Sequence, residues 1–122
     1  MSKFDIYDRV TSFAVRTIHF SEKLSHSFSG KIVAKQLIRS STSIGANLQE
    51  ADGAVSKNDF LNKLGTSRKE SLETQYWLDI IKRSNLIKNP KNLEELDFLC
   101  CESKEISKII CSIIINTKKN NA

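Results

Sequence analysis

The chain has 122 residues, of which 39% are hydrophobic and 27% charged, and its formal net charge is +5. This length is sufficient for one domain that buries a core without disulfides or metals. One proline and four glycines are too few for the frequent turns of a many-stranded β fold. Basicity of this size permits nucleic acid or an anionic surface as a partner and requires neither.

The N-terminal sequence and the cysteines favour a cytoplasmic protein. The segment MSKFDIYDRV is charged and lacks the apolar run of a signal peptide. The longest apolar runs, within residues 109–115, are too short to span a bilayer, so no membrane association is expected. The cysteines are Cys100, Cys101 and Cys111. An odd number in an apolar segment predicts buried free thiols in a reducing compartment.

Apolar residues at helical spacing predict helices along the whole chain. The first helix is expected over residues 3–23, and a Ser- and Gly-rich loop follows over residues 25–30. The second helix is expected over residues 31–52, ending before Gly53. The core stripes are Ile6, Val10, Phe13, Thr17, Phe20 and Leu24 in the first helix, and Ala34, Leu37, Ser41, Ile44, Leu48 and Ala51 in the second.

Capping residues mark the two helices that follow. The third helix is expected over residues 57–84, with Ser56 as its N-cap. The fourth is expected over residues 90–117, with Asn89 as its cap and Pro90 in the first position. The core stripes are Phe60, Leu64, Ser67, Ser71, Thr74, Leu78 and Ile81 in the third helix, and Leu96, Leu99, Ser103, Ile106, Ile110 and Ile113 in the fourth.

Long helices joined by short connections predict an antiparallel up-and-down four-helix bundle. No internal repeat, low-complexity segment or second domain is apparent in the sequence. We therefore expect one all-α domain over residues 1–122.

The stretch QLIRSSTSIGANLQEA, residues 36–51, carries small polar side chains where a solvated helix face would carry charged ones. Ser41 and Gly45 lie on or beside the core stripe, where small residues allow a neighbouring helix to approach closely. The third helix has its own small polar row at Ser67, Ser71 and Thr74. We expect a partly buried polar seam between these helices, in which Arg39 and Asn47 pair with carboxylates. The seam residues are Arg39, Ser43, Asn47, Glu50, Glu70 and Glu73.

No recognisable catalytic, metal or cofactor site accompanies this seam. A di-iron bundle needs Glu-x-x-His pairs, and neither His19 nor His26 follows a glutamate in that way. No serine or cysteine has a histidine base beside it, and no phosphate-binding glycine motif is present. The sequence therefore predicts no catalytic residue, no metal, no cofactor and no enzyme. Only the seam carboxylates near Arg39 would support catalysis.

Basic residues form two groups that should meet at one end of the bundle. No acidic residue occurs between Lys23 and Gln49. In an antiparallel bundle the connection after the first helix lies at the same end as the connection after the third. Candidate phosphate contacts are Arg9, Arg16, Lys23, Lys31, Lys35, Lys82, Arg83, Lys88 and Lys91. No aromatic residues interleave with them, which argues against readout of single strands. The alternative is a solvated rim.

The last part of the fourth helix, KIICSIIIN, is apolar nearly all round. A helix with one face exposed to solvent needs apolar residues only on its other face. Either the bundle wraps these turns or they are buried between subunits, and we expect a homo-oligomer. The interface candidates are Ile109, Ile110, Ile113, Ile114 and Ile115.

The second and third helices together carry a pattern that is similar to a known family. It comprises Gln36, Leu37, Arg39, Ser40, Ser43, Ile44, Asn47, Leu48 and Glu50, then Phe60, Leu64, Ser67, Glu70, Glu73, Trp77 and Leu78. The chain resembles, from its first helix to its fourth, the bacterial four-helix-bundle proteins encoded within intervening sequences of 23S ribosomal RNA genes. It departs from the family pattern at Ala51, where glycine is frequent, and in the small-residue run at Leu64-Gly65-Thr66.

This resemblance implies a small cytoplasmic bundle without known catalytic residues. Some members assemble as ring-like homopentamers. A related group serves as accessory factors of diversity-generating retroelements, binding nucleic acid and a reverse transcriptase through a basic surface. We therefore expect a non-enzymatic homo-oligomeric accessory module that binds RNA or DNA weakly. The alternative is a protein–protein interaction scaffold that binds no nucleic acid.

Overall fold

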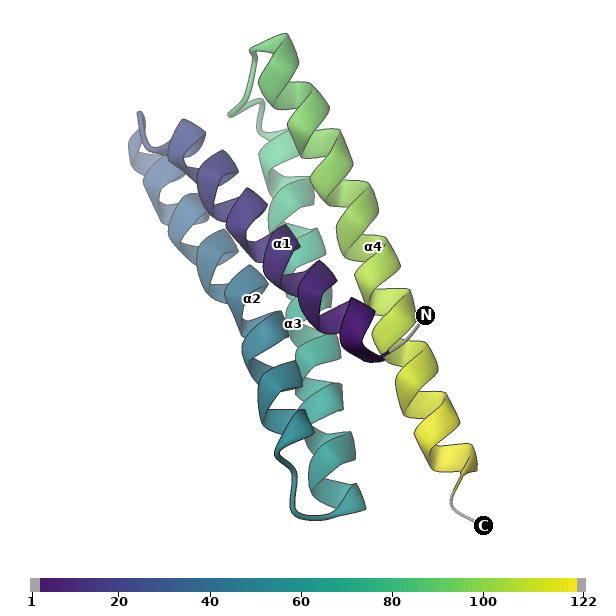
Figure 1. The fold of residues 1–122 in the computed structure, drawn as a ribbon. Helices are drawn as coiled ribbons and strands as arrows, with labels where there is room; N and C mark the ends of the chain where they lie inside the picture. The colour runs from purple at the N-terminus through teal and green to yellow at the C-terminus, as the bar shows by residue number, and fades with distance from the viewer. Residues whose placement is uncertain (1–2, 121–122) are drawn as a thin grey trace.

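The computed structural model describes residues 3–120 as a bundle of long helices (Figure 1). The elements are α1 (Lys3–Ser21), a short 3-10 helix η1 (Glu22–Leu24), α2 (Phe28–Asp52), α3 (Lys57–Arg83) and α4 (Pro90–Lys119). The long helices lie side by side with alternating direction, so the predicted all-α four-helix bundle is confirmed. No helix in the described part of the chain is long and apolar enough to cross a membrane.

Side-chain caps begin three of the helices where the chain turns. The Ser56 and Asn89 side chains accept backbone N–H groups of Asp59 at 3.0 Å and Lys91 at 2.8 Å, so both predicted caps are confirmed. The predicted loop over residues 25–30 is wrong in its second half, because α2 begins at Phe28. The Ser27 hydroxyl caps it by accepting the Gly30 N–H at 3.0 Å. A serine-rich stretch suits a helix cap as well as a loop.

The core consists of the predicted helix stripes. Every stripe residue is buried except Phe60 and Ile113, which are partly exposed. The buried apolar side chains form one continuous cluster that draws on all of the long helices. A single core of this kind requires the helices to keep one register, because a rotated helix would expose its stripe.

Small hydroxyl side chains fill the interior between α2, α3 and α4. The Ser67 hydroxyl donates to the Ile44 carbonyl at 2.8 Å, and the Thr74 hydroxyl donates to Ser40 Oγ at 2.9 Å. The members of this hydroxyl layer are Ser40, Ser41, Ser67, Ser71, Thr74, Ser103 and Ser107, all of them buried. Among the described residues, no buried side-chain oxygen or nitrogen lacks a hydrogen-bond partner. The layer therefore brings helices close together without an unsatisfied polar group.

The far end of α4 extends past the start of α1 (Figure 1). Ile113 and Ile114 are partly exposed there, and Ile115 is 47% exposed. Ile109 is also partly exposed, whereas Ile110 is fully buried in the core. The bundle therefore does not wrap the last turns of α4, and Ile110 is a core residue of the single chain.

Of the four glycines, Gly30 has the closest neighbouring backbone. A Cβ atom at this position would lie 1.9 Å from the carbonyl oxygen of Leu24, so the neighbouring chain would have to move. We expect Gly30→Ala to destabilise the protein by about 1–3 kcal/mol in urea unfolding, because the added methyl overpacks this contact.

Gly65 provides the matched control for this substitution. It also lies in a helix, but a Cβ atom there would meet nothing within 4 Å. We expect Gly65→Ala to stabilise the protein by up to about 1 kcal/mol, the difference in helix propensity between the two residues. Equal stabilities of the two variants would contradict the close contact at Gly30.

Candidate functional site

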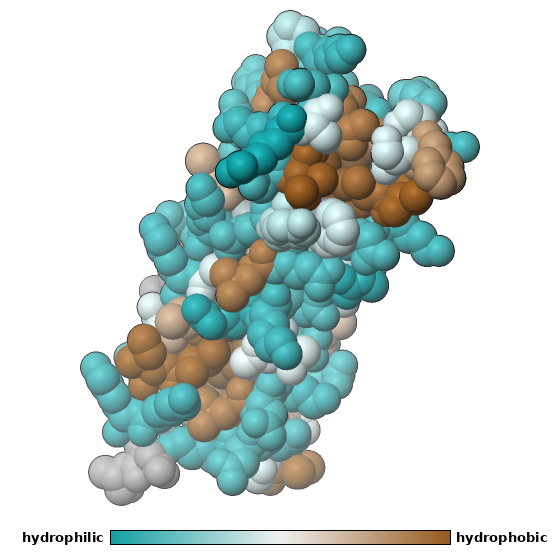
Figure 2. All heavy atoms as spheres, turned by 180° about the vertical axis from the view of Figure 1, so that it is seen from behind, coloured by the Kyte–Doolittle hydropathy of each residue, from teal (hydrophilic) through white to brown (hydrophobic). Residues whose placement is uncertain are grey.

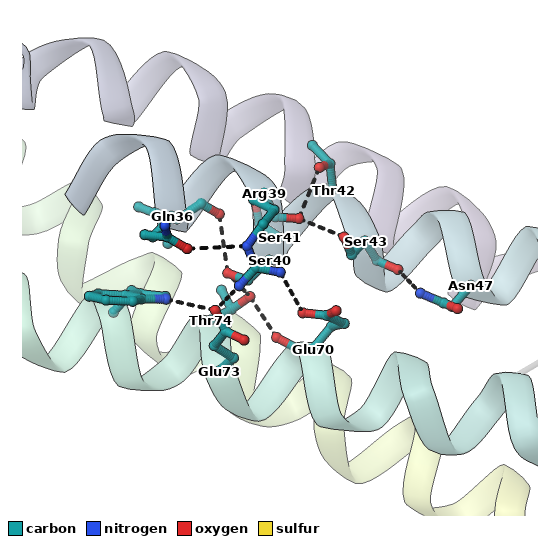
Figure 3. Close-up of polar contacts among 12 residues, drawn as sticks. Gln36, Arg39, Ser40, Ser41, Thr42, Ser43, Asn47, Glu70, Glu73 and Thr74 are labelled. Atoms are coloured by element: carbon teal, nitrogen blue, oxygen red, sulfur yellow. Dashed lines mark hydrogen bonds and ion pairs between the residues drawn. The ribbon is translucent and has the colours of Figure 1, made fainter. Parts of the chain in front are cut away.

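An arginine of α2 joins two carboxylates of α3 across the seam (Figure 3). The Arg39 Nη1 atom lies 3.3 Å from Glu70 Oε1, and Arg39 Nη2 donates to Glu73 Oε2. The Gln36 side chain accepts from Arg39 Nε at 3.2 Å. The Trp77 indole N–H also donates to Glu73, at 2.9 Å. The predicted pairing of Arg39 with Glu70 and Glu73 is confirmed.

The other seam residues do not join this pair. The Asn47 amide donates to the Ser43 carbonyl at 2.8 Å, and the Ser43 hydroxyl donates to the Arg39 carbonyl at 2.7 Å. Both side chains are therefore satisfied by the preceding turn of their own helix, as short polar side chains in helices often are. The expectation that Asn47 pairs with a carboxylate is wrong.

Glu50 also lies outside the Arg39 pair. Its carboxylate binds Lys63 Nζ at 2.8 Å, and this hydrogen bond raises the pKa of Lys63. The glutamate is close to the end of α2, so the cation it reaches is on the first turns of α3. The expectation that Glu50 pairs with Arg39 or Asn47 is therefore wrong.

The seam has two layers that differ in exposure. The Arg39 side chain is 46% exposed, and those of Glu70 and Glu73 are 20% and 37% exposed. The hydroxyl layer beneath them is buried. Charged pairs thus line the edge of the α2–α3 contact, and neutral hydroxyls occupy its interior. This separation avoids the desolvation of charges that a fully buried seam would require.

Two arginines among the predicted phosphate contacts instead connect α1 to α4. Arg9 donates to both carboxylate oxygens of Glu102 at 2.7 and 2.8 Å, and Arg16 donates likewise to Glu95. The hydrogen bonds to these glutamates raise the pKa of both arginines. The Arg16 guanidinium also lies 3.6 Å from the centre of the Phe98 ring. Both arginines have structural partners, which reduces their availability to phosphates.

Lys82 and Arg83 also lie near carboxylates. Lys82 Nζ is 3.7 Å from Asp97, and Arg83 is 3.0 Å from Asp79 one turn earlier on α3. These side chains are well exposed, so the pairs contribute little to stability. The two aspartates nevertheless offset the positive charge that the sequence predicted for this part of the surface.

The remaining basic candidates are exposed and form no ion pair within residues 3–120. They are Lys23, Lys31, Lys35, Lys88 and Lys91. Lys23 lies in η1, Lys31 and Lys35 lie in the first turns of α2, and the other two flank the start of α4. The α1–α2 and α3–α4 connections lie at the same end of the bundle (Figure 1), which we call the loop end.

Titratable side chains elsewhere do not gather into a reactive site. Within the described residues, no three His, Cys, Asp or Glu side chains are placed to hold a metal ion. His19 and His26 are exposed. All cysteines are free thiols, but the expectation that they are buried is wrong, because Cys101 is exposed on α4 and Cys100 and Cys111 are partly exposed. Burial raises the pKa of the Cys100 thiol, which makes it a weaker nucleophile at neutral pH.

Comparison with known proteins identifies the family. The sequence matches 23S rRNA-intervening sequence proteins over residues 2–112. The chain belongs to this family. No curated protein matches the sequence of this family member.

A solved structure supports the same assignment for this 23S rRNA-intervening sequence protein. It is a crystal structure of a protein with unknown function from the S23 ribosomal protein family of Bacteroides thetaiotaomicron VPI-5482. That protein is 38% identical and superposes with a TM-score of 0.83, covering 93% of this chain and 98% of its own. The family membership predicted from the sequence is confirmed. The link to retroelement accessory factors stays a prediction.

The solvent exposure of the Arg39 ion pairs determines how much stability the protein should lose when Arg39 is removed. We expect Arg39→Ala to lower the free energy of unfolding by about 1 kcal/mol or less, since Arg39 and its two carboxylate partners all keep access to water. Urea unfolding measures this change. A decrease of about 3 kcal/mol or more, typical of a buried pair that loses one partner, would contradict the exposed placement of the pair.

Proposed function

We propose that the protein is a non-enzymatic cytoplasmic accessory module that assembles with itself and binds RNA or DNA weakly through the loop end. The observation that carries the proposal is the group of exposed lysines there that form no ion pair within residues 3–120. Ammonium groups of this kind bind phosphates without reading sequence, and such binding weakens as salt rises.

Four of the nine candidate phosphate contacts have carboxylate partners, so we propose the remaining lysines as the main contacts. Arg9 and Arg16 are held by glutamates of α4, and Lys82 and Arg83 lie beside aspartates. No carboxylate of residues 3–120 forms an ion pair with the remaining lysines, so none competes with a phosphate for their ammonium groups. Lys31 and Lys35 also lie in the acid-free stretch between Lys23 and Gln49, so no carboxylate next to them in the sequence opposes an approaching phosphate.

A non-enzymatic role is supported by how the polar groups are used. The hydroxyls of the core donate to neighbouring carbonyls or to one another, as in the hydrogen bond between Ser71 and Ser107 at 2.6 Å. The seam carboxylates bind Arg39 and Trp77. These contacts are structural, and none of them places a base beside a nucleophile.

Self-assembly is supported by the exposed apolar side chains at the end of α4. A groove of about 450 Å³ adjoins them and is lined by residues of α3 and α4 that include Leu61, Gly65 and Ile114. Exposed apolar surface of this kind commonly marks a protein contact. The same observation favours a second candidate function, a protein–protein interaction scaffold that binds no nucleic acid.

Charge reversal at the loop end tests the nucleic-acid proposal. We expect the purified protein to bind a structured ribosomal RNA fragment and an unrelated duplex, with affinity that falls steeply as salt is raised. We expect Lys88→Glu with Lys91→Glu to weaken binding to both. The slope of log affinity against log salt should decrease by about 0.9 for each duplex phosphate that the variant no longer binds. Fluorescence anisotropy across a salt series measures both quantities.

The control for this experiment makes the same charge change away from the loop end. Lys69→Glu with Lys104→Glu alters exposed lysines in the middle of α3 and α4 that form no ion pair in the described chain. Equal weakening in the two double variants, or no binding at low salt, would contradict the proposal. Sedimentation of the same samples tests assembly, and a monomer at micromolar concentration would contradict that part.

A further inference from the structure

An aromatic side chain projects from the first turn of α2. Phe28 is the first residue of this helix and is 83% exposed. It belongs neither to the buried core nor to the partly buried side chains that pack against the core. The Ser27 hydroxyl caps the N-terminus of α2, so the phenyl ring of Phe28 has no part in the cap. The ring is therefore available to a ligand.

Lysines share the helix face on which Phe28 lies. Residues three, four and seven positions further along a helix lie on the same side, which here places Lys31, Ile32 and Lys35 with Phe28. All of them are exposed, whereas Val33, Ala34 and Leu37 on the opposite side are buried. We call this set of Phe28, Lys31, Ile32 and Lys35 the Phe28 face. The expectation that no aromatic residue interleaves with the basic candidates is therefore wrong here, because Phe28 lies in α2 and not in the predicted loop.

The charge around the Phe28 face favours an anionic ligand. Lys31 and Lys35 form no ion pair in the described chain, and no acid occurs between Lys23 and Gln49. Seen from behind, the upper end of the molecule, which is the loop end, presents hydrophobic residues bordered by hydrophilic ones (Figure 2). A ligand that suits this face has flat apolar groups and regularly spaced negative charges.

We propose that the Phe28 face binds single-stranded RNA or DNA, with a base stacked on Phe28 and phosphates bound by Lys31 and Lys35. This inference rests on the proposed nucleic-acid function and specifies its ligand. A duplex keeps its bases stacked inside, so its base faces are not accessible to the ring, whereas an unpaired base is.

A protein partner suits the Phe28 face less well. Lysine is depleted from the cores of protein–protein interfaces, yet here lysines alternate with the apolar side chains. Phe28 and Ile32 alone also form a small apolar area compared with the patches that mark protein contacts. Ile114 and Ile115, which belong to the end of α4 proposed for self-assembly, lie at the other end of the molecule.

The test uses a labelled short oligouridylate and a duplex RNA of the same length as probes. We expect Phe28→Ala to weaken binding of the single strand by about 5-fold or more, the effect of removing one stacked base. Phe28→Trp, which keeps an aromatic face, should bind the strand as the unchanged protein does. Duplex affinity should not change in either variant, because only lysines contact the duplex.

Val55→Ala is the matched control, because Val55 is 94% exposed in the α2–α3 connection at the opposite end. We expect it to bind both probes as the unchanged protein does. Thermal unfolding of Phe28→Ala should match that of the unchanged protein, since the ring lies outside the core. These controls distinguish removal of the stacking ring from misfolding of the protein.

Several outcomes would overturn the inference, and they are distinguishable. If the unchanged protein binds both probes and Phe28→Ala binds the strand equally well, the stacking contact fails while the proposed function stands. If the unchanged protein binds neither probe at low salt, the proposed function fails as well. If Phe28→Ala changes only the mass in sedimentation, the Phe28 face is a contact between copies of the chain.

Discussion

The close approach of α2 and α3 through small hydroxyl side chains is the constraint on which the structure depends. Ser40 and Thr74 meet across this contact, and Ser67 reaches the backbone of α2. Larger side chains would separate the helices, and alanines would leave the contact without its directional hydrogen bonds. Because Ser67 and Thr74 hydrogen-bond to defined partners on α2, they favour one rotation of α3 against α2, and this rotation places Arg39 opposite Glu70 and Glu73.

This arrangement leaves the middle of the bundle structural and leaves its ends available to partners. The seam hydroxyls and carboxylates are committed to contacts between helices, and two arginine–glutamate pairs join α1 to α4 in the same way. The groups that we propose as contacts with partners are at the ends. Lysines and Phe28 are exposed towards the loop end, whereas Ile115 is exposed and Ile113 and Ile114 are partly exposed at the far end of α4. The two proposed kinds of partner, nucleic acid and other copies of the chain, therefore have separate surfaces.

The sequence predicted the fold well, because periodic apolar residues and caps report local structure directly. The stripes and the Ser56 and Asn89 caps agree with the structure. The contacts of long polar side chains were harder to predict, since the residue type does not reveal which of several possible partners lies nearest. Arg39 had the expected carboxylates, but Asn47 bonded to its own helix and Glu50 to Lys63. The exposed face at Phe28 could not be predicted, because a serine-rich stretch suits a loop as well as a helix cap, and Ser27 is in fact the cap of α2.

Substitution of Ser67, which lies within the α2–α3 contact, tests the central claim most directly. Urea unfolding of Ser67→Ala should show a decrease of about 1 kcal/mol for the hydrogen bond to Ile44, and Ser67→Leu should decrease stability by a further 1–3 kcal/mol or so because it separates the helices. Ser12→Leu on the exposed side of α1 should cost far less. If Ser67→Leu is as stable as Ser67→Ala, the small size of the side chain is not what holds α2 and α3 together, and the account is wrong.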